Sequence, residues 1–187
     1  MKNSSITVFL LLTAVVLVSC GGQKQAATAE EMAQLEEMVN AKTFELNARW
    51  ANPLASQSIN AISSAGLLPP GSNPNRIDII GTSSFIKVEQ DSVFAILPYY
   101  GERQFGGAYN PQEVGIKFKG VPEAFEISYN EKKQHYELEF DITNEHGEAF
   151  NINGTLFPNL RTVFYINSTE RRTIGYSGYV DALEEEE

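Results

Sequence analysis

Three carboxylates in the chain have the spacing that places side chains on one face of a strand. Glu137, Glu139 and Asp141 alternate with large apolar residues. In a strand they would lie about 7 Å apart along one face. An inverting glycosidase uses a carboxylate pair at about that separation, one as acid and one as base. The alternation favours a simpler interpretation, a solvent-exposed face whose carboxylates pair with Lys117 and Lys119 of another strand.

A second group of candidate residues is aromatic and lies in a glycine-rich stretch after a strongly apolar segment. It contains Tyr99, Tyr100, Phe105 and Tyr109, with Arg103 among them. Flat rings at the mouth of a barrel can stack on a sugar or cover an apolar ligand. The same rings can instead close one end of the hydrophobic core. We take the four rings as the predicted ligand site and keep closure of the core as the alternative.

Other signals of catalysis or metal binding are absent from the sequence. Of the two histidines, His135 begins a predicted strand and His146 lies in a predicted turn. No third residue is spaced to complete a zinc site with them. The chain also has no nucleophile elbow, no His-Glu-x-x-His pattern and no phosphate-binding loop. We therefore predict no metal, no cofactor and a non-enzymatic protein, with a hydrolase as the least favoured alternative.

Cys20, the only cysteine, follows a segment typical of a secretory signal. Lys2 precedes an apolar run over residues 6–18 that is too short to span a bilayer, which takes about 20 residues. Leu17-Val18-Ser19-Cys20 resembles the lipobox of bacterial lipoproteins, in which the cysteine is acylated and becomes the first residue. We predict a signal peptide over residues 1–19 and lipid attachment at Cys20. The alternative is an ordinary signal peptide beside a stray cysteine.

The residues after Cys20 and the overall charge limit the location and the partners. In known lipoprotein sorting signals, an aspartate directly after the cysteine retains the protein in the inner membrane, and an acidic run soon after the cysteine directs it to the cell surface. By resemblance to these signals, this chain carries neither, because Gly21 follows the cysteine and residues 22–25 are not acidic. These features predict the periplasmic face of the outer membrane. A formal net charge of -10 argues against nucleic acid, which requires clustered Lys and Arg. No basic amphipathic stretch is present either, so membrane attachment would rest on the lipid alone.

The chain begins its predicted fold with one short helix. Residues 20–27 are small and polar and predict a flexible tether. Thr28 and Glu31 form a capping-box pattern, and the helix should run to about residue 40. Met32, Leu35 and Val39 form its expected apolar stripe.

From residue 43 the apolar period changes to two, which indicates strands. The segment at 93–97 is apolar on both faces and is predicted to be a central, doubly covered strand. Short strands without helical interludes predict an antiparallel meander, closed as a barrel or sandwich. We expect one β-rich domain at 28–183 and an acidic tail at 184–187. The predicted strands are 43–50, 58–62, 85–89, 92–97, 113–119, 125–129, 135–141, 149–157, 162–166 and 173–180.

Two motifs resemble a known family. Leu97-Pro98-Tyr99-Tyr100-Gly101 and Arg172-Thr173-Ile174-Gly175-Tyr176-Ser177-Gly178 are similar to segments of the Bacteroidetes lipoproteins called domain of unknown function four-two-five-one. The likeness covers nearly all of the chain after Cys20. It implies a lipid-anchored all-β domain of lipocalin-like shape. It carries no known catalytic residues.

The function favoured by these observations is binding. We expect an outer-membrane lipoprotein that binds a small apolar or glycan ligand. The alternative is a structural or assembly partner of another envelope protein, using a sheet edge or the irregular segment at residues 52–76.

Overall fold

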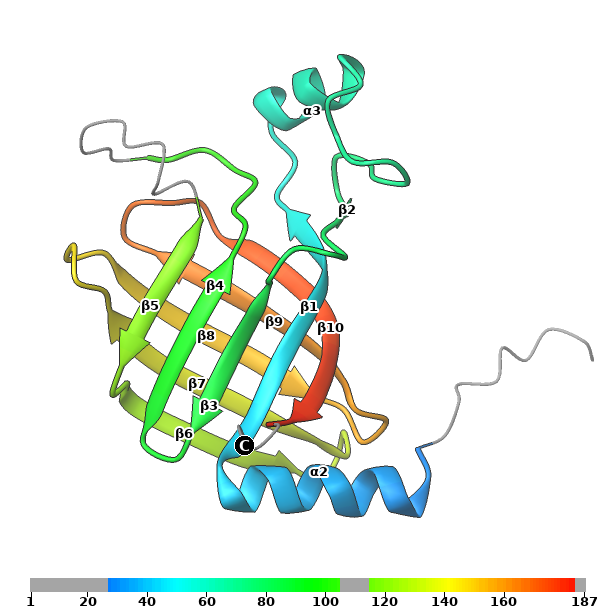
Figure 1. Ribbon diagram of the computed structural model, residues 1–187, viewed down its shortest axis with the longest axis vertical. Helices are drawn as coiled ribbons and strands as arrows, with labels where there is room; N and C mark the ends of the chain where they lie inside the picture. Colours follow the sequence, from blue (N-terminus) through cyan, green and yellow to red (C-terminus); the bar gives the residue numbers. More distant parts are fainter. Residues whose placement is uncertain (1–26, 105–114, 184–187) are drawn as a thin grey trace, which may run out of the picture.

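The computed structural model describes residues 27–104 and 115–183, which form one curled antiparallel sheet and two short helices. The sheet has ten strands in the order β5-β4-β3-β1-β10-β9-β8-β7-β6, and β2 pairs with β1. The sheet curves so that β1, β3, β4 and β5 face β6 to β9 across the core (Figure 1). The predicted all-β fold with a barrel-like curl is confirmed. The elements are α2 (Ala29–Ala41), β1 (Thr43–Pro53), α3 (Gln57–Ser64), β2 (Ile77–Asp78), β3 (Phe85–Glu89), β4 (Ser92–Leu97), β5 (Ile116–Gly120), β6 (Glu123–Asn130), β7 (His135–Thr143), β8 (Ala149–Leu156), β9 (Arg161–Ser168) and β10 (Ile174–Ala182).

The described strands leave a seam where the barrel would close. β5 and β6 are the two ends of the strand order and do not pair with each other. Aromatic rings fill the space between them instead. Phe118 of β5 lies 6.2 Å from Phe140 and 5.5 Å from Phe150, measured between ring centroids. Phe125 of β6 stacks on Phe140 at 5.7 Å. The seam is therefore held by apolar packing and not by backbone hydrogen bonds.

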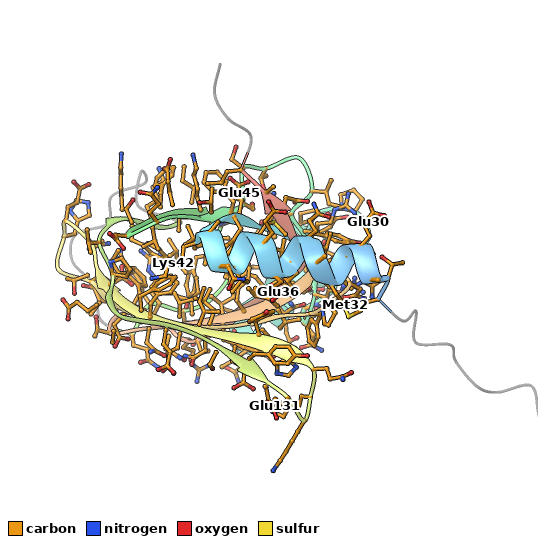
Figure 2. The ribbon with its side chains drawn as sticks, turned by 90° about the horizontal axis from the view of Figure 1, so that it is seen from below. Glu30, Met32, Glu36, Lys42, Glu45 and Glu131 are labelled. Carbon is orange, nitrogen blue, oxygen red and sulfur yellow. The ribbon has the colours of Figure 1, made fainter. Side chains whose placement is uncertain are left out.

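Helix α2 covers one end of the curled sheet (Figure 2). Its predicted capping box is present: the amide of Glu31 donates to the Thr28 hydroxyl, and the Glu31 carboxylate accepts from the Thr28 amide. The buried stripe is Leu35, Met38 and Val39. Met32, which we predicted in the stripe, is exposed because the buried side of the helix is narrower than the sequence suggests. None of the described helices is both long enough and apolar enough to cross a bilayer.

Two of the predicted strands are corrected by the structure. The strand at 58–62 is wrong, because these residues belong to α3. Ser56 caps that helix by accepting a hydrogen bond from the Ile59 amide, and Ile59 alone is buried. β4 is present, but it lies next to the edge strand and is fully buried on one face only. Its outward Phe94 packs on Phe85 of β3, with ring centroids 5.5 Å apart.

Gly178 of β10 provides a test of the pairing between the first and last strands. A Cβ atom at Gly178 would lie 1.8 Å from the Asn47 carbonyl oxygen of β1. We expect Gly178→Ala to lower the free energy of unfolding by about 1–3 kcal/mol or more, because backbone must shift. The control is Gly154→Ala, whose Cβ would meet side chains only at 3.5 Å and beyond. If urea denaturation shows the same loss of unfolding free energy for both variants, this account of Gly178 is contradicted.

Candidate functional site

A cavity of about 580 Å³ opens at the seam. The turn that joins β7 to β8 and the loop that joins β9 to β10 both contribute to its lining, and they lie away from the end of the sheet that α2 covers (Figure 1). The cavity lies between these two segments and the edge strand β5. The volume is within the usual range of small-molecule sites. Its lining residues are Phe94, Arg103, Gly115, Lys117, Phe118, Lys119, Asn144, Glu145, His146, Glu148, Glu170 and Arg171.

A buried ion pair forms the floor of this site. The Arg171 guanidinium donates from Nε and Nη2 to the two carboxylate oxygens of Glu148, at 2.9 and 3.2 Å. The side chains of Glu148 and Arg171 are 3% and 5% exposed. The Ser168 hydroxyl donates to Glu148 and accepts from the amides of Glu170 and Arg171. This two-point contact joins the turn before β8 to the loop before β10 and gives both a defined shape.

Arg103 extends the ion pair toward the segment that follows β4. Its guanidinium lies 3.1 Å from the Glu170 carboxylate and 3.8 Å from the Glu148 carboxylate. Its backbone also forms a bridge with that of Arg171. Three separate segments of the chain therefore meet at one charged cluster.

Two predicted ligand-site residues lie beside this cluster and are engaged by the protein itself. The Tyr99 hydroxyl is within hydrogen-bond distance of the carbonyls of Glu102, at 3.0 Å, and Arg172, at 3.1 Å. The Arg171 guanidinium lies 5.2 Å from the Tyr99 ring, and partial burial raises the pKa of Tyr99. Tyr100 packs against the core, and its burial raises its pKa. These contacts match closure of the core, the alternative role of these rings.

The ligand site at the four rings stays a prediction. Phe105 and Tyr109 lie outside the described residues, as does the predicted lipid-attachment residue Cys20.

The two motifs of the family resemblance contact each other near the cavity. The Tyr176 hydroxyl donates to the Pro98 carbonyl at 2.7 Å. Complete burial raises the pKa of Tyr176 well above its usual value, so this phenol stays protonated as a donor. Arg172 lies 3.6 Å from Glu102 and adds a second link between the segments. The motifs thus fasten the end of β4 to the start of β10.

The acidic strand that suggested a hydrolase faces solvent. Glu137 accepts hydrogen bonds from the His135 ring and from Asn130, at 3.1 and 3.0 Å, and they lower its pKa. A hydrolytic acid would need a raised pKa. Asp141 accepts from the Asn151 side chain at 2.8 Å. The predicted pairing of these carboxylates with Lys117 and Lys119 is wrong, because those lysines lie on β5, beyond the seam.

The two histidines are separated in the structure. His135 is buried, and its ring lies edge-on to Phe157 with centroids 5.7 Å apart. His146 is exposed in the turn before β8, with Nε2 3.4 Å from the Glu145 carboxylate. Within the described ranges, no three side chains of the types that bind metals come together.

Sequence reasoning missed Glu148 and Arg171, although both stand beside recognised features. Arg171 directly precedes the second family motif, and Glu148 directly precedes a predicted strand. Their pairing joins residues 23 positions apart through two loops. The alternation of residues along a strand does not predict such a contact, so the one available signal was a second arginine, Arg171, directly before the Arg172 that begins the motif.

Comparison with known proteins identifies the family. The model of the family described as "Domain of unknown function (DUF4251)" matches residues 26–180. The chain belongs to this family. A solved structure, described as a DUF4251 family protein from Bacteroides eggerthii DSM 20697, aligns with a TM-score of 0.54 and 16% identity. The alignment covers 82% of this chain and 89% of that one, and it shows a shared fold. No curated protein matches.

The buried pair in this DUF4251 protein can be tested by removing one charge. We expect Glu148→Gln to lower the free energy of unfolding by about 3–5 kcal/mol, because Arg171 would stay buried without its counter-charge. Glu145→Gln is the control, since Glu145 lies in the same turn with its side chain 87% exposed. Adding Arg171→Met to Glu148→Gln should restore part of the loss. Urea denaturation curves that coincide for the Glu148 and Glu145 variants would contradict a stabilising role.

Proposed function

We propose that this chain is a lipid-anchored envelope protein whose half-barrel binds a small ligand carrying an acidic group in the seam cavity. The observation that carries the proposal is the charge at the cavity. Lys117 and Lys119 line it, and neither makes an ion pair with any described residue. The chain as a whole has a formal net charge of -10. Two unpaired cations at a cavity of such a protein favour an anionic ligand.

The arrangement of the lining supports a ligand with both an acidic group and a flat or apolar body. Lys117 and Lys119 point from the same face of β5, about 7 Å apart by strand geometry. The Lys119 ammonium lies 6.0 Å from the Phe94 ring centroid, so an apolar wall adjoins the positive charge. Arg171 and Arg103 already face Glu148 and Glu170, which leaves the lysines to receive a further anion. Of the two predicted ligand classes, a glycan with a carboxylate or sulfate suits this lining better than a purely apolar molecule.

Two surface features support the second candidate, an assembly partner of another envelope protein. β5 and β6 present outer edges that no described strand covers, and such edges can accept a strand from another chain. Helix α3 and the segments that adjoin it project beyond the sheet (Figure 1) and carry exposed apolar side chains. They are Leu54, Ile62 and Leu67.

Native mass spectrometry of the protein purified from its own cell envelope tests both candidates. We expect a small acidic molecule to accompany the wild type and to be lost from the Lys117→Gln/Lys119→Gln variant. Glutamine keeps the edge of β5 polar, so the change removes charge without exposing an apolar strand. The control, Lys132→Gln/Lys133→Gln, makes the same charge change in the turn between β6 and β7 and should retain the molecule. An empty wild-type protein would contradict ligand binding, and a co-purifying protein chain would support assembly.

The lipid anchor is tested separately by Cys20→Ser. We expect this variant to lose labelling by an alkyne-bearing fatty acid and to leave the membrane fraction, because stable anchoring takes two or more acyl chains. Ser19→Ala is the control, since it keeps a small residue before the cysteine. Density-gradient separation of the envelope should place the wild type with the outer membrane. Membrane retention and labelling of Cys20→Ser would refute the anchor.

A further inference from the structure

The outer face of β7 to β10 carries an exposed aromatic ring that is held against the sheet. Tyr165 of β9 is 52% exposed and lies opposite Gly175 of β10 in the register. A Cβ atom at Gly175 would lie 2.9 and 3.1 Å from two carbons of the Tyr165 ring. The ring therefore occupies the space above the glycine. The Cδ1–Cε1 edge of the ring lies against the backbone of β10 at Gly175, and about half of the side chain is exposed to solvent.

Polar side chains continue from this ring across the neighbouring strands in a connected series. Asn153 lies opposite Tyr165 and donates to Asn151. Asn151 donates to Asp141 at 2.8 Å and accepts from Asn167 at 3.3 Å. Thr173 donates to Asn167 at 2.7 Å. Because each amide bonds its neighbour, the side chains are oriented before any ligand arrives.

A hollow of about 320 Å³ lies at one end of this series. Asp141, Asn151 and Asn167 line it, with Glu123 and Thr169. Its volume is sufficient for a small ligand. The ring and the hollow therefore share one polar surface across β7, β8 and β9, on the outer face of the sheet.

The charge of this surface selects the chemical class of ligand. The lining of the hollow includes two carboxylates and no lysine or arginine. Carboxylates repel anions but accept hydrogen bonds from hydroxyl groups, and side-chain amides both donate and accept. An exposed ring beside alternating donors and acceptors matches a sugar, which presents an apolar face and a rim of hydroxyls.

We propose that the outer face of β7 to β9 is a second binding site, specific for a neutral saccharide. Tyr165 stacks on one pyranose ring, and Asn153, Asn151 and Asp141 bind hydroxyls of that sugar and the next one. Tyr165 is not part of the seam cavity. The site is thus independent of the acidic-ligand proposal.

A panel of neutral hexasaccharides tests the site: cellohexaose, xylohexaose, mannohexaose, maltohexaose and chitohexaose, titrated into the purified protein by calorimetry. We expect at least one to bind, with an affinity at least tenfold lower for Tyr165→Ala and nearly unchanged for Tyr165→Phe, which keeps the ring. Asn153→Ala should weaken binding severalfold. Tyr129→Ala is the matched control, because Tyr129 is 49% exposed on β6 and should leave the affinity unchanged.

The outcomes separate the two sites. The saccharide site is supported if the Lys117→Gln/Lys119→Gln variant still binds the sugar and the Tyr165→Ala variant does not, with both melting temperatures unchanged. This result would hold whether or not the seam cavity binds its acidic ligand. Failure of all five sugars to bind at millimolar concentration would overturn it. Equal losses for Tyr165→Ala and Tyr129→Ala would overturn it as well.

Discussion

The sheet of this protein ends in two edges that do not pair, and the rest of the structure compensates for that opening. A closed barrel would satisfy those edges with hydrogen bonds. Here the rings of Phe118, Phe125, Phe140 and Phe150 fill the gap. At the end that α2 covers, Lys42 places its ammonium 5.2 Å from the Phe125 ring and so links the helix to the edge strand β6. Apolar packing thus replaces the missing backbone hydrogen bonds of the seam, and the cavity opens beside it.

The opposite end of the seam is stabilised by charge instead of apolar packing. The Glu148–Arg171 pair is almost fully buried, and its desolvation is offset by two charge-assisted hydrogen bonds and by Ser168. The two family motifs meet next to this pair through Tyr176 and Pro98. A rigid charged floor under a cavity suits binding, because the ligand need not order the site. On the outer face of β7 to β9, the series of amide hydrogen bonds likewise orients the side chains before a ligand binds.

The sequence predicted most strands because their residues alternate between a buried and an exposed face. β7 and β8 illustrate this, with ends that differ from the predicted ones by two residues or fewer. The alternating pattern gave a wrong prediction at α3, because its serine and alanine residues show no clear hydrophobic period. The helix there begins at the cap formed by Ser56. The pattern also failed at β4, whose outward Phe94 and Ile96 are apolar without lying under a second layer. The Glu148–Arg171 pair depends on how two distant loops meet, which local spacing does not encode.

The pairing of the first and last strands has a consequence for how the chain acquires its structure. β1 pairs with β10 over nine residue pairs, from Phe44 with Ala182 to Pro53 with Ile174. Contacts between segments so far apart in the sequence slow folding, since the intervening chain must be ordered first. A chain emerging from its amino end cannot complete this sheet until its last strand has appeared. Closure of the sheet by β1 and β10 is therefore the last pairing that the order of synthesis allows.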